Sequence, residues 1–233
     1  MMRLLAQACR WGRSASLGLL GLAWLIALQL SLAASDFERL QAAALQRWGG
    51  GIMPRFNAWR NLVVSGRAST DADRIRQVNF FFNRQTRFGE DEVIWQQTDY
   101  WATPLETLGR GAGDCEDFAI AKYFTLLEAG VAPEKLRLIY VRAKVGISDS
   151  TPTQAHMVLA YYAQPEAEPL VLDNLVDEIR PASRRPDLVP VFSFSRAGVF
   201  TGVSARETTP AASTGRLSRW EDLLRRAKAE GFD

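Results

Sequence analysis

Apolar residues in the first half of the chain recur every three or four positions, which is typical of helices that bury one face. Start and stop signals limit these stretches, including a possible capping box at Ser35–Glu38 and a glycine at position 130. The predicted helical segments are Ser35–Trp48, Pro54–Val64, a stretch from Asp71 or Asp73 through Phe82, a short helix and turn within Trp95–Leu108, and Phe118–Ala129.

From residue 136 onward the pattern becomes that of β-strands. The predicted strands are Leu136–Val145, His156–Ala163, Pro169–Leu175 and Val191–Phe194, with a possible fifth over Val199–Val203. Helices followed by strands favour an α+β fold with an antiparallel sheet over alternating βαβ units. After the strands, the polar residues 204–217 predict a flexible loop, and Ser218–Glu230 predicts a charged C-terminal helix.

The first 34 residues have the order of a secretory signal peptide. Three arginines (Arg3, Arg10 and Arg13) precede an apolar run over Leu17–Leu32, and small residues follow it. The run of about 16 residues is shorter than the ~20 that a spanning helix needs, although an uncleaved inner-membrane anchor remains an alternative. We therefore expect residues 1–34 to be a signal peptide, residues 35–203 to form one domain, and residues 204–233 to form a polar loop and a helix.

Composition narrows the functional classes. The chain has 233 residues and is 47% hydrophobic, which suffices for a well-buried core and excludes a disordered, collagen-like or disulfide-scaffold protein. Beyond the leader, 25 basic residues face 26 acidic ones, so no basic footprint for nucleic acid is present. Because Cys9 lies in the leader, the mature chain has one thiol, Cys115, and one imidazole, His156.

Cys115 is the strongest candidate for chemistry, because it opens a predicted helix. A helix N-terminus favours a thiolate through its unpaired N–H groups and its dipole. The preceding Gly111 and Gly113 are expected to let the backbone approach a substrate and to leave N–H groups free for an oxyanion. Taken alone, a helical cysteine also fits the role of a small buried hydrophobe.

Three acids surround this thiol: Asp114, Glu116 and Asp117. Unscreened, their charges would raise the pKa of Cys115, so either His156 forms an ion pair with the thiolate, or a cation sits on the acids, or both occur. The alternative is that the acids merely complement the positive end of a helix. One histidine and one mature cysteine make catalytic zinc improbable on ligand grounds.

His156 and Asp173 lie on two strands that a turn near residue 165 would join. The expected register places the two residues opposite one another or one step away. Their Cβ atoms would be about 5 Å apart when directly paired and about 7–8 Å apart on the diagonal. An aspartate could then hold the imidazole, which gives a nucleophile, a base and an orienting carboxylate. Individually, each residue also fits a structural role at a strand end.

Four sequence blocks resemble the bacterial transglutaminase-like cysteine peptidases, specifically the LapG-type periplasmic proteases. The blocks are Trp101-Ala-Thr-Pro-Leu-Glu106, Gly113-Asp-Cys-Glu-Asp-Phe-Ala-Ile-Ala-Lys-Tyr123, His156-Met-Val-Leu and Val171-Leu-Asp-Asn174. The resemblance implies a papain/transglutaminase-like fold in which Cys115 is the nucleophile, His156 the base and Asp173 the orienting residue. It also implies calcium bound at the acids Asp114, Glu116 and Asp117.

The same resemblance implies a biological role. Proteases of this type cleave a large surface adhesin near its N-terminus, after a pair of alanines, and so release cells from a biofilm. An inner-membrane receptor that senses cyclic di-GMP holds them inactive. Two other functions remain open on the sequence: a transglutaminase-type acyl transferase and a non-catalytic periplasmic calcium-binding module. In the expected acyl transfer, the N–H of Cys115 is one oxyanion donor, and Trp95, Gln96 and Trp101 are candidates for the second.

Overall fold

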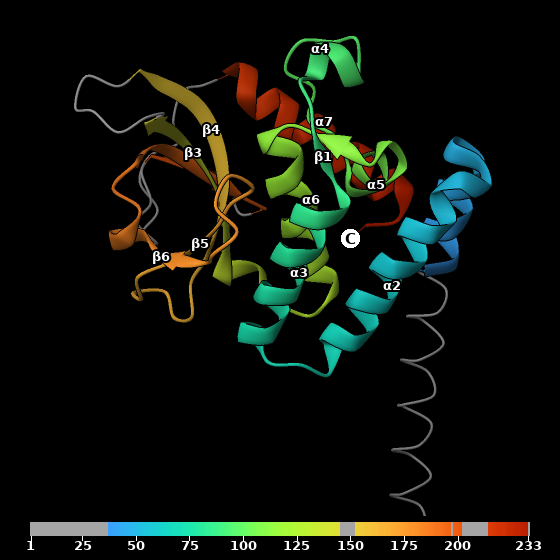
Figure 1. The fold of residues 1–233 in the computed structure, drawn as a ribbon, viewed down its shortest axis with the longest axis horizontal. Coiled ribbons are helices and arrows are strands. Elements are labelled where there is room, and N and C mark those ends of the chain that lie inside the picture. The colour runs from blue at the N-terminus through green and yellow to red at the C-terminus, as the bar shows by residue number, and fades with distance from the viewer. Residues whose placement is uncertain (1–36, 145–151, 197, 202–213, 233) are drawn as a thin grey trace, which may run out of the picture.

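The computed structural model describes residues 37–144, 152–196, 198–201 and 214–232. Helices dominate the N-terminal part, and a six-stranded sheet follows it (Figure 1). This confirms the predicted α+β class with an antiparallel sheet. The leader, the proposed capping box at Ser35 and most of the loop over residues 204–217 lie outside the described residues. Within the described part of the chain, no helix is both long enough and apolar enough to span a membrane.

The first helical segment covers residues 37–48 and leads into a 3₁₀ turn, η1 (Gly49–Ile52). The other helices are α2 (Met53–Arg67), α3 (Asp71–Gln85), α4 (Asp91–Ile94), α5 (Pro104–Arg110), α6 (Cys115–Glu128) and α7 (Thr214–Glu230). Two further 3₁₀ turns are η2 (Pro133–Lys135) and η3 (Ala182–Arg184). α7 begins four residues earlier than Ser218, so the prediction that residues 214–217 belong to a loop was wrong.

The main sheet has the order β6-β5-β4-β3-β7-β8, and every neighbouring pair is antiparallel. Its strands are β3 (Leu136–Lys144), β4 (Thr153–Tyr161), β5 (Leu170–Leu172), β6 (Arg180–Pro181), β7 (Leu188–Ser195) and β8 (Gly198–Thr201). All five predicted strands exist. β4 begins three residues before His156, because its partner β3 extends the ladder to Lys144↔Thr153.

α6 is the central helix, and it is buried at every position from Asp117 to Leu126. A helix that is apolar almost all round belongs in the middle of a core. It packs on β4 and β3 and is flanked by α3 and α5. The main core joins these helices to one face of the sheet, through residues such as Leu138, Leu159 and Phe194. This packing fixes Cys115 at the start of a rigid element.

A short parallel pair, β1 (Arg87–Phe88) with β2 (Ala112–Gly113), was not predicted from the sequence. Two residues per strand give no readable alternation. The amide N–H of Gly89 donates to the Gly113 carbonyl at 3.0 Å, and that of Arg87 donates to the Gly111 carbonyl at 3.0 Å. The pair anchors the turn that leads into α6.

Candidate active site

The backbone that delivers Cys115 is fixed on both sides. Gly111 ends α5 in the left-handed region (φ +61°), and its N–H donates to the Thr107 carbonyl at 2.8 Å. Gly113 packs so closely on Asp117 that an added Cβ would lie 2.6 Å from the Asp117 Cβ. Glycine is therefore required at 111 for its dihedral angle and at 113 for close packing. The N–H of Gly111 closes the helix, so the prediction that it stays free for an oxyanion was wrong.

His156 and Asp173 meet across two strands. The register pairs Leu159 with Leu172, so its continuation puts Asp173 level with Val158, one diagonal step from His156. Both side chains are buried, and His156 Nε2 lies 2.8 Å from Asp173 Oδ1. Of the two predicted registers, the structure adopts the diagonal one. Because Nε2 contacts Asp173, the other ring nitrogen, Nδ1, is left to exchange a proton with a thiol.

Asp173 has further donors that the sequence analysis did not identify. The N–H of Leu175 donates to Oδ1 at 3.0 Å, and Arg185 Nη2 donates to Oδ2 at 2.7 Å. Burial by itself raises the pKa of Asp173, but the bonds from His156, Leu175 and Arg185 outweigh it and lower the pKa to about 2. The carboxylate is therefore charged and held in one orientation.

Two other side chains support the segment that follows Asp173. Asn83 on α3 donates to the Asp173 carbonyl at 2.9 Å and to Asp177 Oδ1 at 2.8 Å. Lys122 on α6 is buried, which lowers its pKa to about 7, while the charges of Asp173 and Asp177 favour its cationic form. Asn83 thus ties the Asp173 loop to α3, and Lys122 places a cationic group of α6 within electrostatic range of the same loop.

The thiol of Cys115 lies beside the strand that carries the imidazole. Burial raises its pKa, and the nearby Glu116 and Asp114 raise it further, while the backbone N–H of Met157 lowers it. Met157 directly follows His156 near the middle of β4, so this N–H places the thiol next to the part of the strand that carries the imidazole. The thiol donates to Glu116 Oε2 at 2.7 Å. Transfer of its proton to the imidazole requires the S–H bond to turn away from Glu116.

The acids form two overlapping groups. Asp114, Cys115 and Glu116 offer one set of ligand atoms, and Asp91, Asp114 and Asp117 offer another; within each set the atoms lie within 4.8 Å of one another. Asp91 is the member that the sequence analysis missed. The predicted acids Asp114 and Asp117 thus meet Asp91, whereas Glu116 faces the thiol.

These carboxylates fit a divalent cation. Burial and mutual repulsion raise the pKa of Asp91 to about 7, that of Asp114 to about 10, and that of Asp117 well above its usual range. Asp91 Oδ1 is buried without a hydrogen-bond partner among the described residues. Clustered carboxylate oxygens are the ligands that calcium prefers. A bound cation would satisfy this oxygen and offset the repulsion.

A pocket of about 230 Å³ opens beside the thiol. Its lining contains both acidic and aromatic side chains, and it consists of Phe88, Glu90, Asp99, Trp101, Asp114, Cys115, Glu116, Tyr140, Gln154 and Ala155. The pocket gives a peptide access to Cys115. Trp101 forms part of its wall, with its indole N–H donating to Asp99 Oδ1 at 3.0 Å. The indole N–H of Trp95 points to Asp117 Oδ2 at 3.4 Å.

The family of the chain follows from its sequence match. The model of the bacterial transglutaminase-like cysteine proteinases matches residues 61–186, which is more than half of the chain. The chain belongs to this family. It is a cysteine protease with a transglutaminase-like fold, as the sequence resemblance indicated.

Solved structures agree with this family assignment. Three structures of LapG from Legionella pneumophila are each 39% identical to this proteinase and match 82% of it. The match covers 97% of one LapG chain with a TM-score of 0.66, 98% of calcium-bound LapG with 0.67, and 97% of EGTA-treated LapG with 0.69. A comparison with curated proteins gave no match.

Proposed function

We propose that this proteinase is a calcium-dependent endopeptidase of the periplasm, with Cys115 as nucleophile, His156 as base and Asp173 as orienting residue. One observation carries the proposal: His156 on β4 and Asp173, directly after β5, form a buried pair, and the thiol that opens α6 lies beside β4. Family membership supports the same roles. The pair has the chemistry to accept a proton from a thiol and to hold the resulting imidazolium.

The reaction begins with proton transfer from Cys115 to His156 Nδ1, because Nε2 is bound to Asp173. The sulfur then forms a bond to the peptide carbonyl carbon, and the carbonyl oxygen takes the negative charge. The N–H of Cys115, which as the first residue of α6 has no acceptor within the helix, stabilises that oxygen. The imidazolium returns its proton to the leaving amine as the C–N bond breaks. Water then hydrolyses the thioester, giving up its proton to the same nitrogen and restoring the thiol.

Calcium at the acid cluster would supply positive charge beside the thiol. Asp114, Glu116 and Asp117 are the ligands expected from the resemblance, and the position of Asp91 adds it to this set. In the structure Glu116 also accepts the hydrogen bond of the Cys115 thiol. If Glu116 bound calcium instead, the S–H group would be free to give its proton to His156. A calcium chelator should therefore stop cleavage, and added calcium should restore it.

The substrate that the resemblance supports is a large surface adhesin, cut near its N-terminus after two alanines. Its cleavage would release the adhesin and disperse biofilm cells. The basic and apolar leader over residues 1–34 supports export to the periplasm. An inner-membrane receptor for cyclic di-GMP would sequester the protease, so its periplasmic part should bind the enzyme and inhibit cleavage. Both proposed partners, the adhesin and the receptor, are proteins, and no nucleic-acid partner is proposed.

The deciding experiment incubates the purified enzyme with an N-terminal adhesin fragment that carries the di-alanine site. We expect cleavage after the alanines, complete loss of cleavage in Cys115→Ala with an unchanged circular dichroism spectrum, and no incorporation of an added primary amine. Full activity of Cys115→Ala would refute the nucleophile. Amine incorporation in place of hydrolysis would identify an acyl transferase instead, and changing both alanines to bulky residues tests the specificity.

A further inference from the structure

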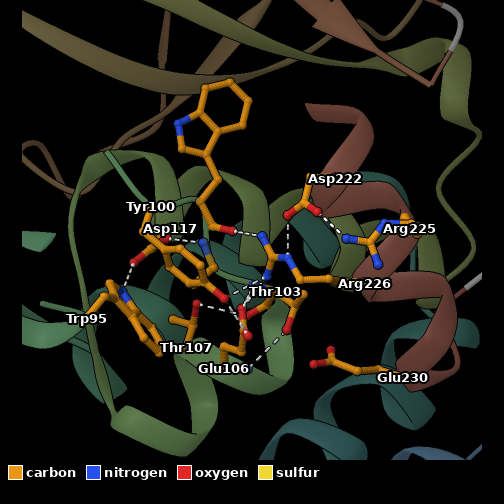
Figure 2. Close-up of polar contacts among 12 residues, drawn as sticks. Trp95, Tyr100, Thr103, Glu106, Thr107, Asp117, Asp222, Arg225, Arg226 and Glu230 are labelled. Atoms are coloured by element: carbon orange, nitrogen blue, oxygen red, sulfur yellow. Dashed lines mark hydrogen bonds and ion pairs between the residues drawn. The ribbon is translucent and has the colours of Figure 1, made fainter. Parts of the chain in front are cut away.

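The C-terminal helix α7 lies outside residues 61–186, the region that the family model matches. Its Arg226 nevertheless contacts the segment around Trp101, which lines the pocket beside Cys115. Figure 2 shows the guanidinium of Arg226 between Asp222 and the buried residues below it. Arg226 Nη2 donates to the Trp101 carbonyl at 2.6 Å, and Nη1 donates to Glu106 at 2.6 Å and to the Tyr100 hydroxyl at 3.0 Å. One side chain thus binds three groups, from Tyr100, Trp101 and Glu106, in the segment that leads into α5 and forms its first turn.

Glu106 is the fixed point of this network. It is fully buried, and it accepts hydrogen bonds from the Thr103 N–H at 2.8 Å and from the Tyr100 hydroxyl at 2.8 Å. Arg47 approaches it at 2.6 Å from the first helical segment. A buried carboxylate is tolerated only when it is paired and hydrogen-bonded, and Arg226 and Arg47 each pair with one oxygen of Glu106.

The segment that Arg226 holds also forms the site. Trp101 lines the pocket beside Cys115, and its ring stacks on Phe194 at 5.3 Å. The next residue, Ala102, donates its N–H to Asp117 Oδ1 at 2.7 Å. A displacement at residue 101 therefore changes the pocket wall on one side and the acid cluster on the other.

We infer that Arg226 is a positioning residue for peptide cleavage, which acts by fixing the Trp101 carbonyl and with it the wall of the Cys115 pocket. Charge alone does not account for the contact set, because a planar guanidinium can reach three acceptors at once and a lysine ammonium cannot match this geometry. The inference rests on the peptidase function proposed above. It assigns to α7 a part in catalysis that the matched family region does not contain.

The test compares Arg226→Met, Arg226→Lys and the double variant Arg226→Met with Glu106→Gln, which removes the charge that the single variant would leave buried. Arg225→Met is the matched control, since Arg225 is the adjacent arginine on α7, is exposed, and pairs with Asp222 alone among the described residues. For each folded protein, kcat and KM are measured on the adhesin fragment at a temperature well below its Tm.

We expect kcat/KM to fall by about 100-fold in Arg226→Met and in the double variant, the loss that a misplacement of about 1 Å produces. Arg226→Lys should recover thermal stability without recovering kcat/KM, and Arg225→Met should match the wild type. Wild-type kcat/KM in the folded double variant, or full rescue by lysine, would overturn the inference. An inactive wild type would instead refute the peptidase function, so the two failures are distinguishable.

Discussion

Replacing Asp173 by asparagine tests the electrostatics of the site most directly. The carboxylate has its pKa lowered from 3.8 to about 2 by its partners in the folded protein. At 1.36 kcal/mol for each tenfold change, this corresponds to about 2.5 kcal/mol of folding free energy above pH 5. Because the folded pKa is the lower one, this contribution is lost as the pH falls toward 2, and about half of it remains at pH 3.

Urea unfolding followed by tryptophan fluorescence at pH 7, 5, 4 and 3 measures this effect. The wild type should be more stable than Asp173→Asn by about 2.5 kcal/mol at pH 7, and the difference should shrink to about 1.3 kcal/mol at pH 3. Titrating groups that do not contact residue 173 contribute equally to both proteins, so the difference reports on Asp173 and the groups paired with it. Glu166→Gln is the control, since that side chain is exposed and should change stability by less than about 0.5 kcal/mol.

Activity gives an independent measure of the same substitution. An asparagine cannot hold the imidazole in the required tautomer or stabilise its cation, so kcat should fall by about 10⁴-fold. A stability difference that is equal at pH 7 and pH 3 would refute the assigned cause of the low pKa. Near-wild-type turnover in Asp173→Asn would remove Asp173 from the catalytic set.

Three further substitutions test the surrounding contacts. Arg185→Met should lower unfolding free energy by about 3–5 kcal/mol in urea titrations, because it leaves the buried Asp173 carboxylate without its Arg185 partner; equal stability would contradict the contact. Asp91→Asn should weaken calcium binding by at least about tenfold in calorimetry, and unchanged affinity would remove Asp91 from the site. Gly113→Ala should cost about 1–3 kcal/mol in thermal unfolding, since its Cβ would meet Asp117, whereas Gly50→Ala has open space and serves as the reference.

Sequence patterns predicted the parts of the molecule that depend on local order. The helix that begins at Cys115 followed from its start and stop signals, and the approach of His156 to Asp173 followed from strand period and turn position, although two registers stayed open and the structure adopts the diagonal one. Strand period also located β3 and β7, although β7 starts three residues before Val191 because its ladder with β3 continues to Leu188. These features are set by near neighbours in the chain.

Contacts between distant, irregular segments could not be predicted. Arg185 follows a 3₁₀ turn in a polar stretch where nothing distinguishes it from Arg184, yet only Arg185 reaches Asp173. Asp91 opens a four-residue helix, 23 positions before Asp114, and no periodic pattern relates the two. Arg226 lies farther still from Trp101. Each of these pairings is fixed by the assembled core, which a single sequence does not display.

The two-residue parallel ladder of β1 and β2 couples the positions of the segments that carry Asp91 and Asp114. β1 ends three residues before Asp91, and β2 ends one residue before Asp114, so the ladder fixes the separation of these carboxylates. A perturbation on either strand is transmitted to the nucleophile turn and the opposite acid together. Paired substitutions at positions 88 and 113 should consequently show a non-zero interaction energy in a double-mutant cycle, instead of contributing independently.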